Sequence, residues 1–222
     1  MNHWTPDSRA AAADAVFDRA PVMPVLAIER IEDALPLGRI LVAAGLPVLE
    51  VTLRTACALE AIARLARKLP QAVVGAGTVL CAADLESVAR AGAAFAIAPG
   101  ATQALYDAAD RSPIPFSPAV ATAREIMQGL DRGHRRFKFF PAVPAGGIAA
   151  LKAFGGPFPQ VRFCPTGGID VCAAPAFLAL SNVGTVGGSW MVPADAVRGG
   201  DWDRIGALAR AAAALRTARE SP

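Results

Sequence analysis

Histidine, lysine and closely spaced cysteine are scarce in this sequence, and their scarcity limits the chemistry that it can perform. The 222 residues include two histidines, and only three lysines stand against 19 arginines. No CxxC spacing occurs among the four cysteines, Cys57, Cys81, Cys164 and Cys172. A zinc site or a disulfide framework is therefore not expected. His3 stands near the N-terminus and His134 in a polar turn, so we expect neither a catalytic histidine nor a histidine-based metal centre.

Long apolar runs are also missing, which argues against a membrane protein. No run approaches the ~20 residues that a membrane-spanning helix needs. The first twenty residues contain three aspartates and no apolar core, so they do not resemble a signal peptide, and we expect a cytoplasmic protein. Charged residues make up 18% of the chain, below the usual ~25%, which predicts that part of the surface is buried between subunits.

Basic residues are scattered among acidic ones, and the net charge is only +3. The densest basic cluster consists of Arg132, His134, Arg135 and Arg136. We interpret this cluster as a solvated turn rather than a nucleic-acid-binding stripe, and we expect no nucleic-acid partner.

From residue 22 onward, short apolar runs alternate with amphipathic or alanine-rich helical stretches. Such runs, bounded by glycine, proline or polar residues, are typical of strands that are buried on both faces. The alternation implies parallel strands with right-handed crossovers and matches a compact α/β fold, the (β/α)8 or TIM barrel. The eight expected strands are Val22–Ile28, Val48–Leu53, Ala72–Val79, Phe95–Ala98, Ile114–Phe116, Arg136–Phe140, Val161–Pro165 and Val183–Gly187.

A doubly wound open sheet is the competing fold. Its GxGxxG fingerprint begins at Gly75-Ala76-Gly77, but Leu80 occupies the position of the third glycine. We therefore favour the barrel. Residues 21–222 are expected to form a single domain, residues 1–20 a short N-terminal helical arm, and residues 219–222 a frayed tail.

One of the three lysines stands where lysine is unusual. Lys68 and Lys152 belong to helical stretches that can expose them, whereas Lys138 stands inside the sixth strand. Because side chains alternate along a strand, Lys138 points into the barrel if Phe137 and Phe139 face the helices. Burial disfavours the charged form of an amine, and a neutral amine can attack a carbonyl to form a Schiff base. The structural alternatives are a lysine that reaches the strand end or pairs with a carboxylate.

The second strand supplies an acidic residue in an apolar setting. Glu50, Thr52 and Arg54 share one face of this strand, and the neighbours of Glu50 are apolar. A carboxylate placed there needs a partner or a chemical role. One interpretation is an ion pair with Arg54. The other is a general acid/base beside Lys138, with Arg54 holding a substrate carboxylate through a two-pronged hydrogen bond.

Glycine pairs follow the last two strands of the expected barrel. They occur in Thr166-Gly167-Gly168 and in Gly187-Gly188-Ser189. In barrels, the loops after the seventh and eighth strands commonly bind phosphate through backbone N–H groups. Either pair alone could be a tight turn, but two pairs at both expected positions predict a phosphate-binding site.

Five motifs occur in order between residues 21 and 215. They are Leu49-Glu50-Val51-Thr52-Leu53-Arg54, Gly75-Ala76-Gly77-Thr78-Val79, Phe137-Lys138-Phe139-Phe140-Pro141-Ala142, Val161-Arg162-Phe163-Cys164-Pro165-Thr166-Gly167-Gly168 and Gly187-Gly188-Ser189-Trp190. Together they resemble the family of 2-keto-3-deoxy-6-phosphogluconate (KDPG) and 4-hydroxy-2-oxoglutarate (KHG) aldolases. The resemblance implies a class I aldolase on a (β/α)8 barrel, usually a homotrimer, that uses neither a metal nor another cofactor.

The resemblance also implies the reaction. Such enzymes cleave KDPG to pyruvate and glyceraldehyde 3-phosphate in the Entner–Doudoroff pathway, and many also cleave KHG to pyruvate and glyoxylate. By the same resemblance, Lys138 is the Schiff-base lysine and Glu50 the proton-transfer residue. Arg54 and Thr78 contact the pyruvate moiety.

Further substrate contacts follow from the resemblance alone. Pro99 flanks the site, Phe140 covers the imine, and Thr166 is tied to the stereochemical choice at the new hydroxyl group. The phosphate is held by the glycine-rich loops, at Gly167, Gly168, Gly188 and Ser189.

Some positions depart from the family pattern. Ala119 and Ala121 stand where glycine and serine are expected, and Val143-Pro144-Ala145 replaces a more polar stretch. These positions belong to the rim of the site and bear on the relative use of phosphorylated and short substrates. The alternatives are a 2-keto-3-deoxy-6-phosphogalactonate aldolase, a metal-dependent pyruvate aldolase and a non-catalytic barrel that binds a phosphorylated ligand.

Overall fold

The strands of this protein are short and apolar because both of their faces are covered in a parallel sheet. The computed structural model of the protein describes residues 4–215. Within this range every strand pairing is parallel. The strands are β1 (Val22–Leu26), β2 (Val48–Thr52), β3 (Val73–Gly77), β4 (Ala96–Ile97), β5 (Phe116–Ser117), β6 (Ala119–Val120), β7 (Arg136–Phe139), β8 (Arg162–Pro165) and β9 (Val186–Gly188).

These strands close into a barrel. One sheet has the order β5-β4-β3-β2-β1-β9, and a second has the order β6-β7-β8. The bridge pairs Phe163–Val183 and Thr166–Gly187 join β8 to the β9 segment at one seam. At the other seam, β5 continues directly into β6. The expected (β/α)8 barrel is therefore confirmed.

The fifth barrel strand differs from the expected Ile114–Phe116. It begins at Phe116 and is divided at Pro118 into β5 and β6. Proline has no N–H group to donate, so the hydrogen-bond ladder is interrupted there. The carbonyl of Pro118 still accepts a hydrogen bond from the backbone N–H of Lys138, at 3.0 Å. The strand thus reaches further toward the carboxyl end of the barrel than the apolar run indicated.

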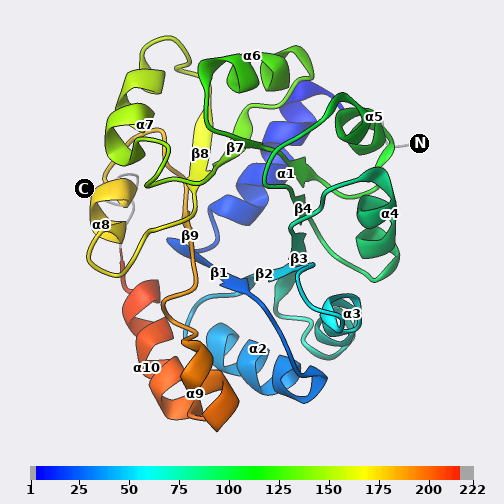
Figure 1. The fold of residues 1–222 in the computed structure, drawn as a ribbon, viewed down its shortest axis with the longest axis vertical. Coiled ribbons are helices and arrows are strands. Elements are labelled where there is room, and N and C mark those ends of the chain that lie inside the picture. The colour runs from blue at the N-terminus through cyan, green and yellow to red at the C-terminus, as the bar shows by residue number, and fades with distance from the viewer. Residues whose placement is uncertain (1–3, 216–222) are drawn as a thin grey trace.

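Helices surround the strands (Figure 1). Within residues 4–215, none of them is long and apolar enough to cross a membrane. The expected tail at residues 219–222 lies outside the described residues, as does His3. The helices are α1 (Pro6–Phe17), the 3-10 turn η1 (Ile31–Asp33), α2 (Ala34–Ala43), α3 (Ala58–Lys68), α4 (Ala82–Arg90), α5 (Gln103–Arg111), α6 (Ala123–Asp131), α7 (Gly147–Gly155), α8 (Ala174–Leu178), α9 (Ala194–Gly199) and α10 (Trp202–Ala213).

Buried apolar side chains form three clusters. The largest contains Leu41 and Leu65 and packs between the first strands and their helices. A second surrounds β7 and β8, where Phe137 and Phe163 are in ring contact. The third includes side chains that point into the barrel, and its buried members are Val16, Phe17, Met23, Val48, Phe95, Ile97 and Cys164.

Helix α1 covers the amino-terminal ends of the strands. Phe17 at its end is only 1% exposed and packs among the side chains inside the barrel. Asp14 accepts hydrogen bonds from the guanidinium groups of both Arg136 and Arg162, which stand at the first positions of β7 and β8. Arg162 also pairs with Asp18. Helix α1, which forms the N-terminal arm, is therefore bound to β7 and β8.

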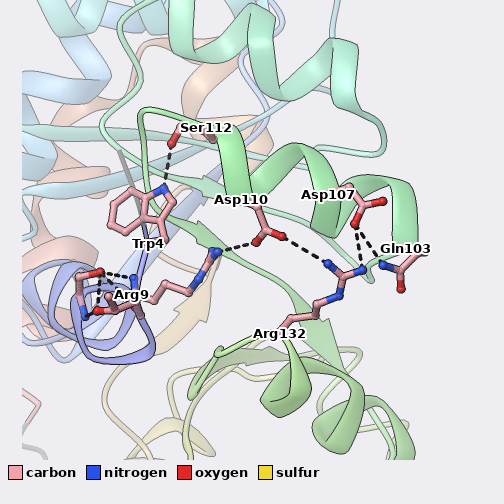
Figure 2. A network of polar contacts seen from close by, with 9 residues as sticks. Trp4, Arg9, Gln103, Asp107, Asp110, Ser112 and Arg132 are labelled. Atoms are coloured by element: carbon pink, nitrogen blue, oxygen red, sulfur yellow. Dashed lines mark hydrogen bonds and ion pairs between the residues drawn. The ribbon is translucent and has the colours of Figure 1, made fainter. Parts of the chain in front are cut away.

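A second polar network fixes the other end of α1 (Figure 2). Arg9 of α1 pairs with Asp110 of α5, and Asp110 in turn pairs with Arg132. Arg132 also pairs with Asp107, at 2.9 Å. The indole N–H of Trp4 donates to the carbonyl oxygen of Ser112, at 2.8 Å.

The interpretation of residues 132–136 as a solvated turn is wrong. His134 is only 2% exposed, and its ring packs against Tyr106 and Phe116. Burial, followed by the charges of Arg9 and Arg132, lowers the pKa of His134 to about 3. Arg135 and Arg136 of this cluster pair with Asp7 and Asp14 of α1, which are more than 100 residues away in the sequence.

Candidate active site

Lys138 points into the barrel from β7. Its neighbours Phe137 and Phe139 are fully buried in the cluster around β7 and β8. Lys138 is 6% exposed, and its Nζ donates a hydrogen bond to Glu50 Oε1, at 2.9 Å. The strand alternation therefore places a primary amine in a nearly water-free interior.

Glu50 is completely buried in the middle of β2. Its Oε1 atom pairs with Lys138, whereas its Oε2 atom has no hydrogen-bond partner among the described residues. The alternative partner, Arg54, instead directs its Nε to the hydroxyl of Thr52, at 3.0 Å. A buried carboxylate with one unpaired oxygen beside an amine can accept and return protons to a molecule bound between them.

The end of β3 makes room for this carboxylate. A Cβ atom at Gly77 would overlap Glu50 Oε1 and come within 2.8 Å of the Cγ and Cδ atoms of Glu50. The next residue, Thr78, has a φ of +60°, which is unfavourable for a β-branched side chain. This strained conformation occurs directly beside the ion pair, where a fixed backbone can orient a bound molecule.

Phe140 lies next to the amine. Its ring centroid is 5.3 Å from Lys138 Nζ. A Cβ atom at Gly167, which has a φ of +104°, would come within 3.3 Å of the same ring. The loop after β8 therefore packs against the aromatic ring beside the lysine, and glycine at position 167 permits both the close approach and the backbone conformation.

Thr166 immediately follows β8 and precedes Gly167. It is 6% exposed, and its hydroxyl donates to the carbonyl oxygen of Cys164 at a long 3.4 Å. A Cβ atom at Gly187 would overlap this hydroxyl. Burial, followed by the charge of Glu50, raises the pKa of Cys164 to about 12, so its thiol stays protonated beside the ion pair.

The remaining candidate residues stand at the carboxyl ends of the strands, the end of a barrel that carries active sites. Arg54, Thr78 and Pro99 follow β2, β3 and β4, and each has some exposed surface. Gly168 follows β8, while Gly188 ends β9 and Ser189 follows it. Among the described residues, direct contacts connect only part of the candidate set, namely Lys138, Glu50, Phe140 and, through the Phe140 ring, Gly167.

Helix α9 is a contributor that the sequence interpretation missed. Arg54 and Ser189 line a common cavity together with Pro193 and Arg198 at the two ends of this helix region. The helix spans six residues, too few for a periodic apolar pattern. The sequence feature that could have indicated this helix is Pro193, which immediately precedes its first residue.

The described residues offer no metal centre. Within residues 4–215, no group of three or more histidine, cysteine, aspartate or glutamate side chains is arranged to hold a metal ion. The four cysteines are free thiols. Metal independence itself stays a prediction.

Comparison with known proteins identifies close relatives. Residues 13–208 match the family model described as KDPG and KHG aldolase. A KHG/KDPG aldolase of Escherichia coli strain K12 is 51% identical over 212 residues, which cover 96% of this chain and 97% of the relative.

Solved structures agree with this match. A KDPG aldolase from Legionella pneumophila, with pyruvate captured as a covalent carbinolamine intermediate, superposes with a TM-score of 0.89 and is 49% identical. The match covers 90% of this chain and 98% of that one. The KDPG aldolase of Zymomonas mobilis ZM4 with 3-phosphoglycerate has a TM-score of 0.88 and 50% identity, over 94% of this chain and 98% of its own.

Proposed function

The chain belongs to the family of KDPG and KHG aldolases, and from this premise we propose that it cleaves KDPG to pyruvate and glyceraldehyde 3-phosphate through a Schiff base on Lys138. The observation that carries the proposal is the buried pair of Lys138 and Glu50, joined at 2.9 Å inside the barrel. The covalent carbinolamine of pyruvate captured in the Legionella aldolase supports the same chemistry.

In the first half of the proposed reaction, Lys138 Nζ attacks the C2 carbonyl carbon of KDPG. Glu50 removes a proton from Nζ and gives one to the departing C2 hydroxyl group, which leaves as water and creates an iminium ion. The unpaired Oε2 of Glu50 suits this task because it is buried and free to accept a hydrogen bond from the reacting oxygen.

In the second half, Glu50 takes the proton of the C4 hydroxyl group while the C3–C4 bond breaks. The bonding electrons move into the iminium system, which gives an enamine on Lys138 and releases glyceraldehyde 3-phosphate. Protonation of the enamine at C3 restores the iminium ion, and water hydrolyses it to pyruvate and free Lys138. The net change is one C–C bond broken, with no oxidation or reduction.

The other candidate residues are proposed to orient the substrate. Arg54 binds the carboxylate of the pyruvate moiety together with Thr78, whose strained backbone fixes its position. Pro99 closes the side of the site, and Phe140 covers the imine. Thr166 contacts the hydroxyl group that distinguishes KDPG from its phosphogalactonate epimer.

The loops after β8 and β9 are proposed to hold the phosphate. Backbone N–H groups in glycine-rich loops can approach an anion closely. The Zymomonas aldolase with 3-phosphoglycerate shows that a relative binds a phosphorylated acid. The proposed phosphate-binding residues are Gly167, Gly168, Gly188 and Ser189.

Cleavage of KHG to pyruvate and glyoxylate is proposed as a second activity. The E. coli relative is named for both substrates. On the rim, Ala119 and Ala121 stand where glycine and serine are expected, and Val143-Pro144-Ala145 replaces a more polar stretch. Steady-state kcat/KM values for KDPG, its phosphogalactonate epimer and KHG on one preparation rank the substrates, and we expect KDPG to be preferred over its epimer.

Borohydride trapping tests the proposed mechanism. Pyruvate and borohydride should give a reduced adduct on Lys138, located by mass spectrometry of peptides, and Lys138→Ala should abolish it. Lys152→Ala is the matched control, because this exposed lysine should leave the adduct unchanged. An adduct on Lys68 or Lys152, or none at all, would contradict the mechanism, and loss of activity in EDTA would indicate a metal-dependent aldolase instead.

Two further properties are proposed, one from the family resemblance and one from the sequence. A homotrimer would cover exposed apolar side chains such as Leu80 and Met127, which are 60% and 57% exposed in the single chain. Sedimentation equilibrium measures this state directly. A cytoplasmic location stays a prediction from the sequence.

A further inference from the structure

Thr52, the last residue of β2, is a buried polar residue that has no part in the mechanism proposed above. It follows Glu50 by two positions, so the alternation of the strand places both side chains on the same face. Thr52 is only 2% exposed. A hydroxyl group buried in this way needs hydrogen-bond partners within the protein.

The hydroxyl of Thr52 has two such partners. It donates to the carbonyl oxygen of Leu26, the last residue of β1, at 2.9 Å. It accepts a hydrogen bond from Nε of Arg54, at 3.0 Å. Because the single hydroxyl proton is directed to Leu26, only the lone pairs of the oxygen remain for Arg54. Thr52 thus connects the guanidinium of Arg54 to the backbone of the neighbouring strand.

The backbone on both sides of Arg54 is held by other hydrogen bonds. The N–H of Leu53 donates to the carbonyl oxygen of Gly77, the last residue of β3, at 2.9 Å. The hydroxyl of Thr55 donates to the carbonyl oxygen of Ile28, which follows β1, at 2.6 Å. Loss of the Thr52 hydroxyl would therefore release the side chain of Arg54 while its backbone stays in place.

The guanidinium of Arg54 depends on Thr52 for its orientation. The side chain is exposed, and within residues 4–215 it has no ion pair and no hydrogen bond other than the bond to Thr52. An arginine side chain has many rotamers, and ordering them at the moment of binding weakens the binding of a ligand. The bond to Thr52 restricts these rotamers before a ligand arrives.

The same bond decides which edge of the guanidinium stays available. An arginine can bind a carboxylate with two parallel hydrogen bonds, either through its two terminal Nη groups or through Nε and one Nη group. Since Nε of Arg54 donates to Thr52, the two Nη groups are left for a carboxylate. A carboxylate would therefore meet this guanidinium end-on rather than from the side.

We propose that Thr52 is a positioning residue, which orients the guanidinium of Arg54 for end-on binding of the substrate carboxylate. The inference rests on the proposed aldolase function, in which Arg54 binds the carboxylate of the pyruvate moiety. The hydrogen bonds of Thr52 go to neither Lys138 nor Glu50. Its hydroxyl therefore acts on recognition of the 2-keto acid and not on formation of the imine.

Removal of the hydroxyl group tests this inference. Thr52→Val keeps the shape of the side chain and should raise the pyruvate concentration for half-maximal borohydride trapping about tenfold, because a hydrogen bond to a charged group is lost. KM for KDPG should rise by a similar factor. The maximal trapping rate and kcat should change less than threefold, since Lys138 and Glu50 keep their contact. Thr52→Ser retains the hydroxyl and should return all four values to within threefold of the wild type.

A neutral analogue of pyruvate shows whether the loss acts through the carboxylate. Pyruvamide carries an amide group in place of the carboxylate, so its trapping rate should be equal in Thr52→Val and the wild type at each concentration. A merely structural role of Thr52 would weaken the trapping of pyruvate and pyruvamide alike.

Thr185→Val is the matched control. Thr185 is also 2% exposed, but its hydroxyl has no hydrogen-bond partner among the described residues. The same substitution removes no contact there and should leave the half-maximal pyruvate concentration unchanged. Thr52→Ala, a second variant without the hydroxyl, should show the same loss as Thr52→Val and controls for the packing of the valine.

Each remaining outcome has a defined meaning. A wild-type half-maximal pyruvate concentration in either folded variant without the hydroxyl would overturn the role of Thr52. An equal loss for pyruvamide, or no recovery in Thr52→Ser, would also overturn it. Absence of trapping in the wild type itself would instead contradict the Schiff-base mechanism.

Discussion

Replacing Gly77 by alanine is expected to displace the Glu50 carboxylate and slow the enzyme about 100-fold. The new Cβ atom would overlap Glu50 Oε1 and lie 2.8 Å from Cγ and Cδ, whereas ordinary contact begins at 3.4 Å. The carboxylate must therefore move by at least 0.6 Å at Cδ and by more at Oε1. Oε1 is the oxygen that accepts the hydrogen bond from Lys138, so this displacement disturbs the ion pair directly.

The size of the effect follows from this geometry. A misplacement of about 1 Å in a reacting group can cost ~100-fold in rate. This factor corresponds to about 2.7 kcal/mol of transition-state stabilisation. Overpacking of a buried site also costs about 1–3 kcal/mol of stability, so Gly77→Ala should remain folded with a lowered Tm. Because Glu50 is fully buried, it has no solvent-exposed position to which it can retreat.

A double-mutant cycle gives the decisive assay. In a Glu50→Ala background the overlapping atoms are absent, so Gly77→Ala should change kcat/KM by less than about threefold there. Gly156→Ala is the matched control, because a Cβ atom at that glycine meets no atom within 4 Å. The reasoning is refuted if Gly77→Ala is folded with wild-type kcat/KM. It is equally refuted if the losses from Gly77→Ala and Glu50→Ala simply multiply.

Two further predictions concern the amino-terminal end of the barrel. Burial lowers the pKa of His134 to about 3, so the unfolded chain binds a proton below pH 6.5 that the native state excludes. Stability should therefore fall by about 1.4 kcal/mol per pH unit between pH 6.5 and 3, and His134→Gln should flatten this dependence in urea titrations. Asp14→Ala should lower the free energy of unfolding by about 2 kcal/mol or more, since Arg136 and Arg162 both lose a partly buried partner. Asp131 is exposed and has no ion pair among the described residues, so Asp131→Ala should cost less than about 0.5 kcal/mol in the same chemical denaturation. Equal losses from the two substitutions would contradict the role of Asp14.

The barrel and its central amine could be predicted because both depend on local pattern. Strands buried on both faces produce short apolar runs, and the alternation of Phe137, Lys138 and Phe139 specifies which side chain points inward. The scarcity of lysine and histidine left Lys138 as the candidate nucleophile. Its partner was not determined by the pattern, since Glu50 could equally have paired with Arg54, four residues away.

Other features depend on residues far apart in the sequence. The basic cluster around Arg136 was interpreted as solvated because its partner Asp14 is 122 residues away. The burial of His134 was missed because its ring packs against Tyr106 and Phe116, which belong to other elements of the fold. The division of the fifth strand at Pro118 was missed because its apolar run ended at Phe116, although the chain continues as strand to Val120.

The division of the barrel into two sheets also makes activity a measure of folding. Glu50 belongs to the six-stranded sheet and Lys138 to the three-stranded sheet, and most strands of the two sheets pack on different apolar clusters. The two side chains are 88 residues apart in sequence, and their pair exists only when the sheets are joined. A partly folded chain with one half in place would have native helix content there and no amine–carboxylate pair. During refolding, recovery of pyruvate trapping should therefore coincide with closure of the barrel rather than with formation of its helices.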